Sequence, residues 1–166
     1  MRTNFKSRLV STAMVFALGF GVQAVGAVEA GKTASVELKN LTGETIGSGK
    51  LTQTPHGVLV NVKVSDLPPG AKGIHLHSKA DCSADTAFQS SKGHHGEGKG
   101  DHGLLNPRGP GKGDLGNIYV GENGVGELQF FKAGVFLEGG DLPLLDDDGT
   151  AIIIHANEDD QVTRPR

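Results

Sequence analysis

The amino-acid sequence predicts an all-β protein, a barrel or sandwich of seven or eight short strands. Three observations favour this class. Short runs that alternate apolar and polar side chains recur along the chain. The 26 Gly and seven Pro residues punctuate these runs with turns. Outside the N-terminal segment, almost no run has the periodicity of an amphipathic helix.

Residues 1–27 are predicted to be a signal peptide. Three basic residues stand near the start, an apolar run covers residues 9–22, and small residues at 25–27 offer a cleavage site. The apolar run is shorter than the roughly 20 residues that a membrane span needs, which disfavours the alternative of a retained anchor. We therefore predict a mature chain of residues 28–166 that is periplasmic or otherwise exported. Its length suits one domain.

The predicted mature chain is mildly acidic. The leader carries three basic residues and no acidic one, so 13 basic and 19 acidic residues remain, and the formal charge changes from -3 to -6. Nucleic acids and acidic membranes require a basic face that displaces counterions. This balance argues against a nucleic-acid partner and, after cleavage of the leader, against a membrane partner. A monomer and a homodimer both stay open.

The first half of the mature chain contains four predicted strands. Residues 33–38 alternate apolar and polar side chains, and a turn separates them from a second strand at 44–52. Residues 58–64 place four valines on one face of a third strand. A proline-rich turn then leads to a short strand at 73–77.

The second half begins with a long irregular stretch, residues 78–117. Such a stretch inside a compact domain is typical of disorder or of a functional loop, and its histidines favour function. Strands are predicted at 118–120 and 126–131, on either side of a Glu-Asn-Gly turn. The last predicted strand, residues 150–154, is apolar and β-branched, and a histidine follows it.

Five of the seven histidines indicate a metal site. His75 and His77 form a His-x-His pair on a predicted strand, which directs both imidazoles to one side. The pair alone is equally typical of two solvent-facing histidines. The other three lie beside glycines or at a strand end, and they are His94, His102 and His155. Imidazole suits copper and zinc, and a carboxylate such as Asp114 suits zinc, so the pattern predicts a mixed site.

Six short motifs follow one another in a specific order. They are GIHLH at 73–77, DCS at 81–83, GH at 93–94, HGLLNP at 102–107, GDLGN at 113–117 and IH at 154–155. The series resembles the copper, zinc superoxide dismutase family, closest to its exported bacterial forms. The resemblance extends from about residue 33 to residue 164 and implies a Greek-key flattened β-barrel.

The resemblance also implies a site and a reaction. The implied copper ligands are His75, His77, His94 and His155. The implied zinc ligands are His94, as a bridging imidazolate, with His102 and Asp114. Asp159 matches the carboxylate that links a copper histidine to a zinc histidine, here His75 and His102. The implied substrate is superoxide, which alternately reduces and reoxidises copper to give oxygen and hydrogen peroxide.

One zinc ligand of the family is absent. Gly111 stands where the family has its last zinc histidine. Structural zinc normally takes four ligands, so we expect zinc to bind less firmly than copper. One hypothesis is that the Lys112 ammonium occupies part of the vacated position, because it lies two residues from Asp114. The alternative is an ordinary solvated lysine.

The family continues beyond the position of Arg166 to a final strand. That segment carries a cysteine that pairs with the position of Cys82 and an arginine that draws superoxide toward copper. We expect the strand, the disulfide and the arginine to be absent, and a natural short form and a truncated sequence both stay open. Cys82 could also be a small buried residue. No role is assigned to Arg164 or Arg166. We expect superoxide to be attracted by copper itself and by Lys79, Lys92 or Lys99.

Two alternatives to the enzyme stay open. One is a catalytically impaired periplasmic copper-binding protein that keeps the four histidines to hold or deliver copper. The other is a non-catalytic sandwich that uses its sheet edges for adhesion, which the retained histidines disfavour.

Overall fold

The computed structural model describes residues 30–98 and 101–163. The predicted signal peptide, Lys99, Arg164 and Arg166 lie outside the described residues. The described chain forms one antiparallel sheet with the strand order β1-β2-β3-β6-β5-β4-β7. The strands in chain order are β1 (Thr33–Lys39), β2 (Thr45–Thr54), β3 (Gly57–Val64), β4 (Gly70–His77), β5 (Asp114–Val120), β6 (Gly126–Ala133) and β7 (Ala151–Ile154).

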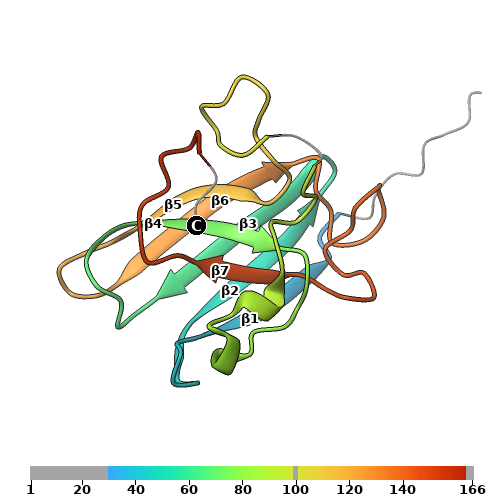
Figure 1. The fold of residues 1–166 in the computed structure, drawn as a ribbon. Helices are drawn as coiled ribbons and strands as arrows, with labels where there is room; N and C mark the ends of the chain where they lie inside the picture. The colour runs from blue at the N-terminus through green and yellow to red at the C-terminus, as the bar shows by residue number, and fades with distance from the viewer. Residues whose placement is uncertain (1–29, 99–100, 164–166) are drawn as a thin grey trace, which may run out of the picture.

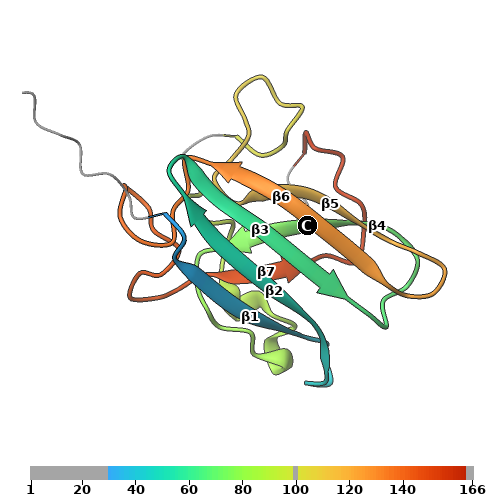
Figure 2. The same ribbon diagram turned by 180° about the vertical axis from the view of Figure 1, so that it is seen from behind.

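The sheet curls into a nearly closed barrel, as two opposite views show (Figure 1 and Figure 2). The connections from β3 to β4 and from β6 to β7 join strands that are not neighbours in the sheet, as in a Greek key. Among the described residues, β1 and β7 are the two edges. The predicted all-β class is confirmed.

The predicted loop at 78–117 extends too far. β5 begins at Asp114, so the segment between β4 and β5 covers residues 78–113. This segment contains two short 3₁₀ turns, Ala84–Thr86 and Gln89–Ser91. The Gly-Asp-Leu-Gly-Asn sequence is typical of a turn, but Asp114 is buried and pairs with His75 in the sheet. Pairing with a buried strand therefore overrides the local turn preference here.

The four valines of β3 show how the alternating pattern builds the core. Val58, Val60, Val62 and Val64 are 0 to 4% exposed, whereas the residues between them are more exposed. They join one apolar cluster with Ile74 of β4. Full burial of one such aliphatic side chain contributes about 1.5–3 kcal/mol. This core fixes β4, the strand on which the candidate site is built.

β4 has β5 on one side and β7 on the other. This order brings three chain segments distant in sequence to one end of the barrel. No helix in the described residues is long and apolar enough to cross a membrane. Cys82 is a free, exposed cysteine, so the alternative of a buried core residue is wrong.

Candidate metal centre

β4 places His75 and His77 at its C-terminal end. Both are buried, with 0% and 8% of their surface exposed. They are two residues apart in a strand, so their side chains have the same direction. His155 directly follows β7, and its backbone N–H donates to the carbonyl of Gly73 on β4 at 2.8 Å. Strand pairing therefore brings three imidazoles together.

A fourth imidazole comes from the long loop. His94 forms a backbone bridge with His77, and its ring centroid lies 4.3 Å from that of His75. The ring centroid of His155 lies 4.8 Å from that of His75. One nitrogen of each ring lies within 4.8 Å of one nitrogen of every other. We call these residues the imidazole group: His75, His77, His94 and His155.

Three buried nitrogens of the imidazole group have no hydrogen-bond partner. They are Nδ1 of His75, Nε2 of His77 and Nε2 of His155. A buried polar atom without a partner costs about 1–3 kcal/mol. The other nitrogens of two of these rings are engaged. Nε2 of His75 lies 2.7 Å from Oδ2 of Asp159, and Nδ1 of His77 lies 2.7 Å from the carbonyl oxygen of Lys92.

These partners fix the tautomers of two rings. A carbonyl and an ionised carboxylate only accept hydrogen bonds, so the ring nitrogen beside each carries the hydrogen. Nδ1 of His75 and Nε2 of His77 then keep a lone pair, which is the state that binds a metal ion. Burial lowers the pKa of His155 to about 4 and also lowers the pKa of His75. His75 and His155 are therefore neutral at neutral pH.

A second group of metal-binding side chains adjoins the first. We call it the carboxylate group, and it consists of His75, His94, His102 and Asp114. Oδ1 of Asp114 lies 2.8 Å from Nδ1 of His102 and 3.5 Å from Nδ1 of His94. Oδ2 accepts hydrogen bonds of 2.8 Å from the backbone N–H groups of Gly103 and Gly111. Both oxygens of this buried carboxylate are engaged inside the protein.

The environment keeps Asp114 ionised. Burial raises its pKa, but the contact with His94 and the backbone N–H of Gly103 lower it further than burial raises it. The pKa of Asp114 therefore lies below its usual range, and its carboxylate carries a negative charge at neutral pH.

Asp159 joins the two groups. Its Oδ2 accepts a hydrogen bond from Nε2 of His75, and its Oδ1 lies 3.0 Å from Nε2 of His102. The Asp159 side chain has no exposed surface. Two hydrogen bonds of 2.9 Å with the side chain of Asn117 hold its backbone in place. A carboxylate in this position orients both rings and raises their basicity.

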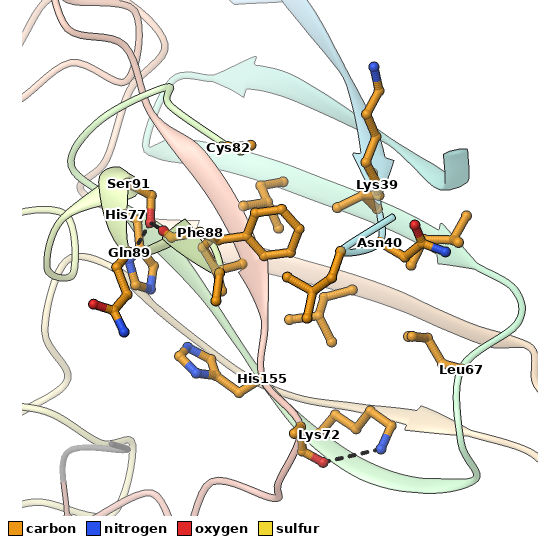
Figure 3. A pocket seen from close by; sticks show the side chains of 18 of the residues that line it. Lys39, Asn40, Leu67, Lys72, His77, Cys82, Phe88, Gln89, Ser91 and His155 are labelled. Carbon is orange, nitrogen blue, oxygen red and sulfur yellow. Dashed lines mark hydrogen bonds between the residues drawn. The ribbon is translucent and has the colours of Figure 1, made fainter. Parts of the chain in front are cut away.

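The imidazole group opens into a groove between the two edge strands. The groove has a volume of about 1250 Å³. His77 and His155 lie close to each other at one end of it (Figure 3). Leu38 of β1 and Ile152 of β7 belong to its apolar lining. A small anion can therefore reach the imidazole group from solvent.

The lysines expected to attract an anion differ in position. Lys92 is exposed and lines the groove beside the imidazole group. The ammonium of Lys79 instead donates to Oδ2 of Asp81 at 3.2 Å. Lys99 lies outside the described residues. Of the two that the structure describes, Lys92 is the one that lines the groove.

The structure brings together the seven side chains that the sequence predicted to bind or link the metals, which are His75, His77, His94, His102, Asp114, His155 and Asp159. The two histidines that were not nominated stay apart from this site. His56 is exposed, and Nε2 of His95 lies 3.2 Å from the carbonyl oxygen of Leu142. The Lys112 hypothesis is wrong, because the ammonium of Lys112 donates to the carbonyl of Gly134 at 3.0 Å.

Sequence reasoning missed Lys132. This residue of β6 is 4% exposed, and its ammonium donates to the carbonyl of Gly111 at 2.6 Å. A signal was available, because Leu128, Phe130 and Lys132 share one face of an alternating strand. A β-carbon added at Gly111 would lie 3.3 Å from Oδ2 of Asp114, so a side chain there would enter the carboxylate group.

Known proteins match this chain over most of its length. The family profile described as copper/zinc superoxide dismutase (SODC) matches residues 45–166. A copper/zinc superoxide dismutase of Aquifex aeolicus is 40% identical over 134 residues, which cover 80% of this chain and 78% of the relative. Another, from Caulobacter vibrioides, is 38% identical and also covers 80% and 78%. A crystal structure of a SOD-like protein from Bacillus subtilis has a TM-score of 0.72 at 32% identity, with 79% of this chain and 88% of that chain covered.

Proposed function

This chain belongs to the copper/zinc superoxide dismutase family, and we propose that it converts superoxide to oxygen and hydrogen peroxide with copper held by the imidazole group. The named relatives favour the enzyme over the copper-holding alternative. The proposed copper ligands are His75, His77, His94 and His155.

One observation carries the assignment of copper to these residues. Three buried ring nitrogens of the imidazole group have no hydrogen-bond partner, although the protein supplies partners for the opposite nitrogens of His75 and His77. Neutral imidazoles suit copper, and an ion at this place would use the unpaired nitrogens. Copper, when bound, supplies a one-electron centre that one superoxide reduces and the next reoxidises.

His94 is proposed to connect the chemistry of the two groups. Its Nδ1 faces Oδ1 of Asp114 at 3.5 Å, so its Nε2 is the nitrogen left for the imidazole group. A ring held between the groups is placed to hold a proton at Nε2 and to pass it to the peroxide product. The groove past His77 and His155 gives superoxide access, and the exposed Lys92 adds positive charge there.

Zinc is proposed to use the carboxylate group with three ligands, His94, His102 and Asp114. The buried carboxylate and its short contact with His102 support this choice, because zinc takes imidazole and carboxylate ligands. Gly111 adds no fourth side-chain ligand, so we expect weaker binding of zinc than of copper.

The chain is also proposed to act outside the cytoplasm after removal of residues 1–27, as a monomer or a homodimer. The basic start and the apolar run of the leader support export. The intact mass of protein from a periplasmic extract tests this: a chain that begins near residue 28 is expected, and a retained leader would contradict it.

An assay of superoxide removal tests the function. Folded protein loaded with copper is compared with a His155→Ala variant loaded in the same way. We expect about one copper per wild-type chain and catalytic removal of superoxide, and loss of both in the variant. Tight copper binding with background activity in the wild type would instead support a copper-holding protein.

A further inference from the structure

A lysine faces the interior of the barrel beside the carboxylate group. Lys132 lies on β6, where the alternation that buries Lys132 leaves Phe131 and Ala133 exposed. The end of β6 lies beside the loop that contains residues 109–113 (Figure 1). A buried charge is costly unless a partner compensates it, so this position requires a physical reason.

The contacts of Lys132 lead to Asp114 in two steps. The ammonium donates to the carbonyl oxygen of Gly111 at 2.6 Å. That same oxygen accepts the backbone N–H of Asp114 at 3.3 Å, and the N–H of Gly111 donates to Oδ2 of Asp114 at 2.8 Å. Lys132 therefore stabilises the turn at Gly111, and this turn donates a hydrogen bond to the carboxylate of Asp114.

The charges of the two residues are complementary. Burial lowers the pKa of Lys132 to about 8, and the negative charge of Asp114 opposes this shift. The ammonium is therefore charged at neutral pH, next to a carboxylate that is also charged. A glycine faces Asp114 at this place, and the Lys132 ammonium donates to the carbonyl oxygen of that glycine.

We propose that the positive charge of the Lys132 ammonium takes over the structural role that a zinc ion would have beside Asp114. The ammonium keeps the turn of Gly111 and Asp114 in its metal-binding arrangement, and its charge opposes zinc binding. The proposal rests on the proposed function, because it assumes that the imidazole group holds copper. Like charges repel across a few ångströms of protein interior, so the ammonium weakens the attraction of a divalent ion to Asp114.

Two measurable consequences follow. Without the ammonium, zinc should bind more tightly, because the repulsion is gone. The zinc-free protein should become less stable, because the carboxylate loses its counter-charge and the turn loses its anchor. Added zinc should restore that stability, because it supplies the missing charge.

The test compares Lys132→Met with Lys112→Met in copper-loaded protein. Lys112 is the matched control, because it lies in the same turn but donates to Gly134. Zinc affinity is measured by competition with a coloured chelator, and melting temperature is measured with and without zinc. We expect zinc to bind about tenfold or more tightly in Lys132→Met and within about twofold of wild type in Lys112→Met.

A second variant keeps the test decisive if Lys132→Met does not fold. Lys132→Gln keeps a side-chain donor near the Gly111 carbonyl but removes the charge, and the same gain in zinc affinity is expected. Unchanged or weaker zinc binding in the folded variant would overturn the proposal. Failure of the proposed function is a separate result, because it would show as wild-type protein that does not bind copper.

Discussion

The imidazole group and the carboxylate group share His75 and His94, but the protein supplies hydrogen-bond partners for their other atoms to different degrees. In the imidazole group, three buried nitrogens have no hydrogen-bond partner. In the carboxylate group, both oxygens of Asp114 are engaged, by His102 on one side and by two backbone N–H groups on the other. A buried lysine lies behind that carboxylate.

This difference indicates how strongly each group requires an ion. Unpaired buried polar atoms are costly, and a bound metal ion removes the cost. Engaged atoms must give up part of their bonding before they bind an ion. We therefore expect the imidazole group to bind copper firmly and the carboxylate group to keep its arrangement without zinc.

The largest expected effect is a difference in activity between two single variants, each of which lacks one proposed ligand from one of the two groups. His77→Ala removes a nitrogen that has no partner in the protein, and it is expected to lower superoxide removal by roughly a thousandfold or more. His102→Ala removes a member of the carboxylate group and its contact with Asp159, and it is expected to cost about tenfold to a hundredfold. Steady-state assays after copper loading measure both. Equal losses would remove the distinction between the groups.

Asp159→Asn tests the connection between the groups. The amide has the same size as the carboxylate, but only one of its two terminal atoms, the oxygen, accepts hydrogen bonds. It therefore cannot accept one hydrogen bond from His75 and another from His102 on separate oxygens. We expect copper affinity and activity to fall about tenfold to a hundredfold. Copper competition and activity assays measure this, with the exposed Asp160→Asn as a neighbouring control. An unchanged copper affinity would show that the link has no role in orienting His75.

Gly111→His sharpens the comparison by adding the ligand that the carboxylate group lacks. The new β-carbon would lie 3.3 Å from Oδ2 of Asp114, so the ring enters the group. Zinc affinity is expected to rise about tenfold, because zinc prefers four protein ligands in structural sites. Calorimetric titration of the copper-loaded protein measures it. Unchanged zinc affinity would show that a ligand other than residue 111 is limiting.

Acid is expected to destabilise the metal-free imidazole group before it affects Asp114. The folded pKa of His155 is about 4, below its ordinary value of 6.5, so below pH 6.5 the unfolded chain binds a proton that the folded chain refuses. The contribution of His155 to stability is therefore constant above about pH 6.5 and falls toward pH 4.

Acid acts on Asp114 in the same direction as on His155, but over a lower pH range. The pKa of Asp114 is lowered from 3.8, so its contribution is present above that value and is lost only at more acidic pH. Thermal unfolding of metal-free protein is expected to give a melting temperature about 5 °C lower at pH 5 than at pH 7.5. A constant melting temperature across this range would contradict the low pKa of the histidines.

Much of the fold followed from the alternation of side chains. The valines of β3 marked an inward face because burial in a sheet repeats every two residues. The start of β5 did not follow, because Asp114 belongs to a turn-like sequence and becomes a strand residue only by pairing with His75. Local preference contains no information about that distant partner.

The candidate site was only partly predictable for a similar reason. Spacing placed His75 and His77 on one side of a strand, and the family resemblance added the ligands from distant segments. The unpaired nitrogens depend on which atom meets Asp159 or Lys92, and these are contacts across the fold. Lys132 was missed because the predicted strand ended at residue 131, whereas β6 continues to Ala133.

The central claim is that four imidazoles from distant segments hold one copper ion through nitrogens that the protein leaves unpaired. A crystal structure of the copper-loaded protein, with anomalous scattering measured at the copper absorption edge, tests it most directly. The account predicts one copper peak in contact with Nδ1 of His75 and with Nε2 of His77 and His155. A copper peak elsewhere, or hydrogen bonds from protein groups to these three nitrogens, would contradict it.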